Sequence, residues 1–226
     1  MTRAAVALCA VMVGGAVLTV RSAQVPLFKE PRHKQVLYTA HLRVLEVTIP
    51  SGDVTLDHWH EYDVATVAIE EASSRTKIGT GAWAEPRPRA IGSLNLTEYT
   101  GARGSHRIET VGTKPFRLIA VENVRDGGWT TPAAIEAPGT TLARESRAFS
   151  IYEIRLDGNT PQTQHTHEMP TVAVLISGAF SYQGGGGSDP FEVRQVGRWV
   201  FGPQGGPHTM RVAPGTEARI VEFEAR

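Results

Sequence analysis

The sequence predicts an all-β protein made of two related halves. Its 226 residues include 23 glycines and 14 prolines, and few runs have a helical period, which indicates short strands joined by turns. Segments such as 42–49 alternate between apolar and polar side chains and are rich in branched residues, as strands are. A set of positions in the first half also recurs at a constant spacing in the second half.

The N-terminus has the pattern of a secretory signal peptide covering residues 1–23. Arg3 precedes an almost wholly apolar run from Ala4 to Val20, and small residues follow at Ser22 and Ala23, where cleavage is expected. This predicts a periplasmic or secreted protein. The alternative is an uncleaved membrane anchor, since the run approaches spanning length; Gly14, Gly15 and the alanines favour cleavage.

Composition excludes several classes of function. The 23 basic residues balance 23 acidic ones, so nothing favours nucleic acid or an anionic membrane surface as a partner, and no stable membrane association is expected after processing. The single cysteine, Cys9, lies in the signal segment. The processed protein would then lack thiol nucleophiles and disulfides, and a metal site would have to use histidines and carboxylates.

The expected elements follow in order along the chain. Residues 25–35, with two prolines, form an entry arm, and a first domain is expected over 36–125 with strands at 42–49, 54–60 and 64–69. A Gly-, Pro- and Thr-containing linker over 126–146, with room for a short helix, leads to a second domain at 147–226. Within it, the glycine-rich stretch 183–190 predicts a hairpin loop.

The repeat is the strongest single observation. When residues 42–70 are set against 149–177, the pair His58 and His60 falls on His165 and His167. After a gap, His106 falls on His208, and the apolar alternation continues in register. A repeat of this length indicates a duplicated domain and not a solenoid.

The repeated histidines point to metal binding. Alternate side chains of a strand share a face, so each His-x-His pair presents both rings on one side. Pro203 and Gly205 predict a tight turn that delivers His208 to the second pair. Three converging imidazoles suit a divalent cation. A single His-x-His would more often serve packing or hydrogen bonding, but two copies, each with a third histidine, favour metal.

The second half resembles the two-motif signature of the cupin superfamily, and the whole chain resembles a secreted bacterial bicupin. The matching positions in that half are His165, His167, Gly178, Gly197, Pro203, Gly205 and His208. The resemblance implies two tandem cupin-type antiparallel β-barrels, also described as a jelly roll or double-stranded β-helix. It also implies six metal ligands, namely His165, His167, His208, His58, His60 and His106.

The chain departs from the cupin pattern at the glutamate ligand. Thr171 and Val64 occupy that position in the two halves, so both sites are expected to lack a carboxylate. In the first half Gly52, His58, His60 and His106 remain, but Arg103 stands where the second motif has glycine. The second site, with its intact turn, is therefore expected to bind metal better.

The resemblance implies a metal-dependent, dioxygenase-like enzyme acting on a small chelating or anionic molecule. Fe(II) is the favoured ion, with Mn, Ni or Zn as alternatives, and isomerase or lyase chemistry stays open. The competing hypothesis is a non-catalytic secreted cupin that binds a metal or small-molecule ligand. A homodimer is an open alternative to a monomer. No catalytic acid or base is evident, and neither His33 nor His41 has a partner pattern that suggests a role.

Overall fold

The computed structural model describes residues 24–99, 103–125 and 131–226 of the protein. Residues 1–23, the predicted signal peptide, lie outside the described residues. Strands dominate the part that is described, and the one helical element found there is a short 3-10 turn, η1 (Leu27–Lys29). Among these residues no helix has the length and apolar character needed to cross a membrane.

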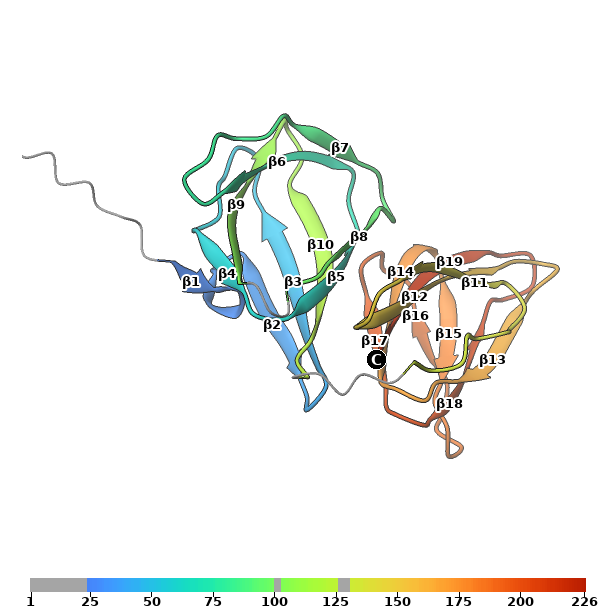
Figure 1. Ribbon diagram of the computed structural model, residues 1–226. Helices are drawn as coiled ribbons and strands as arrows, with labels where there is room; N and C mark the ends of the chain where they lie inside the picture. Colours follow the sequence, from blue (N-terminus) through green and yellow to red (C-terminus); the bar gives the residue numbers. More distant parts are fainter. Residues whose placement is uncertain (1–23, 100–102, 126–130) are drawn as a thin grey trace, which may run out of the picture.

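The first half consists of two five-stranded sheets (Figure 1). One sheet has the order β1 (Val25–Pro26), β4 (His58–His60), β9 (Gly104–Val111), β6 (Ala72–Ile78) and β7 (Arg87–Arg89). The other has the order β2 (His33–Tyr38), β3 (Leu42–Ile49), β10 (Phe116–Asn123), β5 (Asp63–Ala68) and β8 (Leu94–Thr97). All pairings are antiparallel except that of β1 with β4.

The entry arm belongs to these sheets. Val25 pairs with His58 in the parallel β1–β4 ladder, and β2 pairs with β3 from His33 onward. Leu27, between them, is only 2% exposed and packs in the first core. The folded first half therefore extends upstream of the expected boundary at residue 36, because burying Leu27 and pairing β1 stabilise the arm against the sheets.

The second half repeats the plan with one strand fewer. Its five-stranded sheet has the order β11 (Thr140–Glu145), β12 (Phe149–Leu156), β19 (Ala218–Ala225), β14 (Thr171–Gly178) and β17 (Trp199–Gly202). Its four-stranded sheet has the order β13 (Gln162–Thr166), β18 (Pro207–Arg211), β15 (Phe180–Gln183) and β16 (Phe191–Val193). Since β11 pairs with β12, the end of the expected linker is part of this half. The glycine-rich loop joins the antiparallel pair β15 and β16, as a hairpin loop does.

The strand register confirms the duplication. His58 lies opposite His106 in the β4–β9 pair, and His165 lies opposite His208 in the β13–β18 pair. Outside the histidine strands, β3 pairs with β10 as β12 pairs with β19 over their full lengths. Corresponding positions in the two halves can therefore be compared residue by residue.

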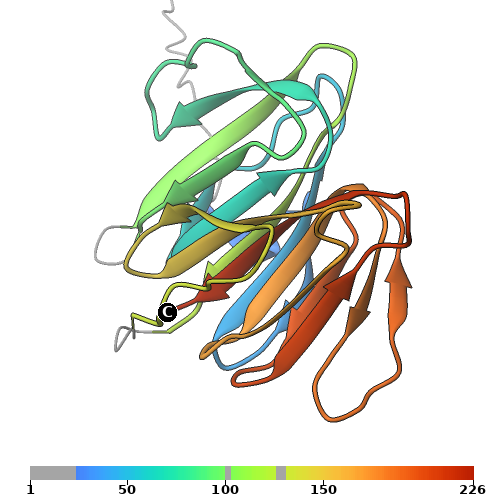
Figure 2. The ribbon, with the colours of Figure 1, turned by 90° about the vertical axis from the view of Figure 1, so that its right-hand side faces the viewer.

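The two halves lie side by side, blue to green and yellow to red, and share a core (Figures 1 and 2). This shared core joins the outer faces of the two β3- and β12-containing sheets, with Val44 and Val67 from one half and Phe149 and Val174 from the other. A separate apolar cluster fills the inside of each half. The side chains of β3, β10, β12 and β19 thus alternate between the shared core and the inside of a half.

Candidate metal centres

The first histidine triad lies inside the first half, where β4 meets β9. The ring centroids of His58 and His106 are 4.5 Å apart, those of His60 and His106 4.8 Å, and those of His58 and His60 5.4 Å. The triad offers one nitrogen from each ring, all within 4.8 Å of one another. Ligands on one ion, each about 2.1 Å from it, are separated by roughly 3–4 Å, so a small movement of these rings would fit them to a divalent cation.

The hydrogen bonds of the first triad leave its ring nitrogens free to bind metal. His58 donates from Nδ1 to the Leu56 carbonyl at 3.0 Å, which leaves its Nε2 buried and without a partner. Both ring nitrogens of His60 are likewise buried and have no hydrogen-bond partner among the described residues. Buried imidazole nitrogens without a hydrogen-bond partner destabilise the folded protein. A cation bound by their lone pairs would remove this cost.

Burial keeps this triad neutral. Burial, together with the charges of the neighbouring histidines, lowers the pKa of His58 to about 4, of His60 to about 2 and of His106 to about 3. At pH 7 all three rings are therefore unprotonated, which is the form that binds a metal.

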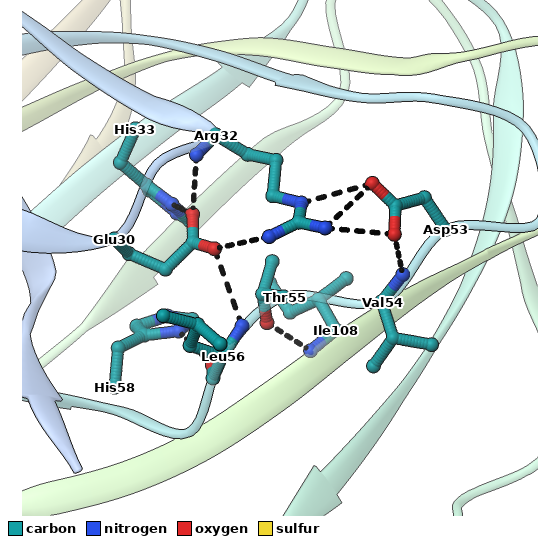
Figure 3. A network of polar contacts seen from close by, with 9 residues as sticks. All are labelled: Glu30, Arg32, His33, Asp53, Val54, Thr55, Leu56, His58 and Ile108. Atoms are coloured by element: carbon teal, nitrogen blue, oxygen red, sulfur yellow. Dashed lines mark hydrogen bonds and ion pairs between the residues drawn. The ribbon is translucent and has the colours of Figure 1, made fainter. Parts of the chain in front are cut away.

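A buried carboxylate, Glu30, supports the first triad from the entry arm (Figure 3). It accepts a hydrogen bond from the backbone N–H of Leu56 at 3.2 Å, and the carbonyl of the same residue orients His58. Arg32 donates to Glu30 and also holds Asp53 with a forked pair of bonds of 2.8–2.9 Å. Burial alone would raise the pKa of Glu30, but the bond from His33 and the other donors lower it to about 2.

His33 was assigned no role from the sequence, and the structure places it beside the triad. Its Nδ1 donates to Glu30 at 2.6 Å, and its ring centroid lies 4.8 Å from that of His58. It also lines the cavity next to the triad. Neither Glu30 nor His33 belongs to a motif, because both come from the arm that the parallel β1–β4 pairing attaches.

A cavity of about 280 Å³ adjoins the first triad. Thr76 lines this cavity and lies opposite Ile108, two residues after His106. In the second half the corresponding residue is Tyr182, which lies opposite Met210, two residues after His208. One inward position earlier, Ser74 corresponds to Phe180. Two small polar side chains therefore leave space in the first half where two aromatic rings fill the second.

The second triad has a fourth ligand candidate, Glu222 of β19. Its carboxylate lies 3.0 Å from Nε2 of His165, 3.0 Å from Nε2 of His167 and 3.3 Å from Nε2 of His208. The expectation that both sites lack a carboxylate was therefore wrong for the second site. The acid comes from a different strand than the one carrying Thr171, and Ala120 holds the corresponding position in the first half.

The second centre is an ion-pair network when it holds no metal. Burial would lower the pKa of His167, but Glu222 and Glu224 on either side of the ring raise it to about 9. Burial would also raise the pKa of Glu222, yet the three histidines hold it well below its usual value. Tyr182 stacks against His208 with ring centroids 5.2 Å apart. The second triad is thus charged and packed, whereas the first is neutral and adjoins a cavity.

Comparison with solved structures identifies the fold. No protein-family model and no curated protein matches the chain. The chain is similar to salicylate 1,2-dioxygenase from Pseudaminobacter salicylatoxidans, with 12% identity, a TM-score of 0.62 and coverage of 85% of this chain and 76% of that one. It is also similar to a cupin 2 conserved barrel domain protein from Leptotrichia buccalis, with 11% identity, a TM-score of 0.56 and coverage of 86% and 88%. The fold is that of a bicupin.

A third similar structure shows that the likeness spans both halves of this bicupin. AerE from Microcystis aeruginosa has 10% identity and a TM-score of 0.60, and the match covers 87% of this chain and 98% of that one. Identities this low establish the fold alone, and any reaction must be argued from the residues themselves.

The remaining candidate residues of the bicupin lie away from the first cavity. Arg103, one of the arginines flanking the second motif, pairs with exposed Glu61 at 3.3 Å and covers the Trp59 ring at 4.5 Å. Trp199 of β17 donates from its indole N–H to Glu46 of the other half at 3.3 Å. These side chains stabilise the surface and the contact between the halves, and none of them lines the cavity beside the first triad.

Proposed function

We propose that this bicupin is a metal-dependent enzyme whose reaction takes place in its first half. The observation that carries the proposal is the pairing of a neutral histidine triad with an adjoining cavity. The second triad, saturated by a buried carboxylate, would serve as a tight and largely structural metal site. Three neutral ligands leave a divalent ion with its full charge, which favours an anionic or chelating substrate.

A redox-active divalent ion in the first site would supply dioxygen chemistry, and Fe(II) is favoured over Mn, Ni or Zn. The protein's part is to bind and orient the substrate. Apolar side chains such as Val64, Ile108 and Phe116 line the cavity and exclude water. Tyr99 stacks on His60 with centroids 4.3 Å apart, and burial raises its pKa to about 12, so its hydroxyl stays protonated as a hydrogen-bond donor.

The reaction class is inferred from the neighbours. Salicylate 1,2-dioxygenase has been captured with gentisate, a small chelating acid, and oxalate decarboxylase from Lactobacillus farciminis also has this fold, with 10% identity and a TM-score of 0.56. Both of these proteins are named for small organic acids. Together with the open, neutral triad, this supports a dioxygenase-like reaction on a small organic acid.

The test is dioxygen consumption and product formation by the Fe(II)-loaded protein, with gentisate, salicylate and oxalate as probes. We expect His60→Ala to reduce turnover by more than about 100-fold, beyond what the loss of a supporting residue costs a metal site. Glu61→Gln, at the next residue and exposed, serves as the matched control and should change turnover little. Full turnover in folded His60→Ala would contradict the assignment to the first half.

A non-catalytic role as a secreted metal or ligand binder is the second candidate. The fully buried second centre favours it, because a site with four protein donors and aromatic packing suits retention of an ion better than exchange of a substrate. Stoichiometric binding of metal and acid without product formation by either triad would support this candidate.

We further propose that the protein is exported and acts outside the cytoplasm. The apolar segment after Arg3 supports this through its signal-peptide pattern. Mass spectrometry of the natively expressed protein should find a mature N-terminus at Ala23 or Gln24 in a soluble fraction. An intact chain starting at Met1 in the membrane fraction would show an uncleaved anchor instead.

A further inference from the structure

The cavity of the first half has a second polar end, marked by Arg89. This residue lies on β7 opposite Ala72, whereas His106 lies opposite Ile78 on the same neighbouring strand, β6. Six residues of strand separate those two positions, so their backbones are roughly 20 Å apart. Both Arg89 and the triad nevertheless line the same cavity, which therefore reaches from one position to the other.

Arg89 has no acceptor in the part of the chain that the structure describes. Its Nε is buried without a hydrogen-bond partner, and no ion pair to its guanidinium is found there. Burial lowers its pKa and so does the neighbouring charge of Arg87, but an arginine keeps its proton under these conditions. The buried Nε–H of this half-buried cation has no acceptor, which is costly, and an anionic ligand in the cavity would remove that cost.

The rest of the cavity wall carries no opposing charge. The described residues that line it include no aspartate or glutamate, and their polar members near β8 are neutral, as in Ser93, Asn95 and Thr97. Two other arginines face elsewhere: Arg198 lines a hollow between the halves, and Arg211 lines one on the second half. Arg89 is thus the side chain placed to balance a negative charge inside this cavity.

We propose that this cavity binds a small monocarboxylate, with its carboxylate on Arg89 and its other end directed toward the first triad. The apolar body would pack against Phe116 and Leu118, which line the space between the two ends. A volume of about 280 Å³ sits at the lower end of the roughly 300–1,000 Å³ of small-molecule sites, so the ligand is small. One guanidinium neutralises one charge, which favours a carboxylate over a doubly charged phosphate ester.

This inference rests on the proposed function for the role of the acid as substrate, but the binding step itself needs no metal. The test therefore uses metal-free protein and calorimetry with three probes: benzoate, its neutral analogue benzamide, and phenyl phosphate. We expect benzoate to bind at least about tenfold more tightly than benzamide, as a buried charge-assisted hydrogen bond would give. Benzoate should also bind more tightly than phenyl phosphate.

The matched variants are Arg89→Gln and Arg87→Gln, which remove neighbouring charges from the same strand. Arg89→Gln should abolish the preference for benzoate over benzamide, Arg89→Lys should keep part of it, and Arg87→Gln, outside the cavity lining, should keep it all. Equal binding of benzoate and benzamide by the wild type, tighter binding of phenyl phosphate, or an unchanged preference in folded Arg89→Gln would overturn the proposal. Arg89-dependent benzoate binding without turnover of any acid would count against the proposed function alone.

Discussion

Replacing His208 with alanine is expected to remove most of the tightly held metal, whereas His106→Ala should remove less. The second site offers four donors, with Glu222 balancing the charge of the ion, and the first offers three neutral ones. Its third histidine is also better fixed: the N–H of Gly205, at φ +70°, donates to the His167 carbonyl at 3.0 Å and closes the turn before β18. A ligand held in place before binding loses less conformational entropy.

The measurement is metal per chain after dialysis against a graded series of chelator concentrations. We expect at least about a 10–100-fold difference in affinity between the sites, the range that loss of a supporting metal contact produces. The difference should grow as the pH rises toward about 9, because metal must displace the proton of His167 at the second site. Loss of the tight metal in His106→Ala, with His208→Ala still loaded, would reverse the ranking.

Replacing Glu222 with glutamine is expected to cost the metal-free protein about 3–5 kcal/mol of unfolding free energy, the usual cost of breaking a buried ion pair. The carboxylate is fully buried and contacts all three histidines of the second triad. In a chain of 226 residues this corresponds to a melting temperature lower by roughly 6–20 °C. Thermal unfolding of the chelator-treated wild type and variant measures it.

The effect of Glu222→Gln should depend on pH in a defined direction. The pKa of Glu222 is lowered in the folded state, so its contribution is present above its unfolded value of 4.5 and disappears as the pH falls. The pKa of His167 is raised to about 9 from 6.5, so its contribution is complete below 6.5 and is lost as the pH rises through 9. The gap between wild type and variant should be widest between these two unfolded values.

Glu122→Gln provides the matched control for the charge change. Glu122 is equally buried on the corresponding strand of the first half, where it pairs with Arg43 at 2.6 Å. Burial raises its pKa to about 7, so near pH 5.5 a neutral amide resembles its protonated form, and the substitution should cost less. A loss in Glu122→Gln as large as in Glu222→Gln would mean that any buried acid matters and that the triad contacts do not.

Strand alternation and the internal repeat predicted an all-β, duplicated chain with two groups of three histidines, and the resemblance to cupins predicted the rest of the fold. Strand alternation predicts that both histidines of each His-x-His pair lie on one face of their strand. The repeat then identifies His106 and His208 as the third histidine of each triad. The sequence also contained a sign of Glu222: the repeat sets Ala120 of β10 against Glu222 of β19, so an acid replaces an apolar residue on the inward face. That contrast is visible only once the repeat is carried to the end of the strand.

The difference between the two centres was decided by the tertiary structure. Glu30 and His33 reach the first triad because the entry arm attaches to both sheets, through the parallel β1–β4 pair and through His33 opposite Val47 in the β2–β3 pair. No local pattern encodes these contacts. Arg89 carries no motif either, and only the tertiary structure shows that it lines the same cavity as the triad. The alternation of residues along one strand predicts which face of the sheet each side chain occupies. Which distant side chains meet on that face depends on long-range packing, and such packing produces no fixed spacing in the sequence.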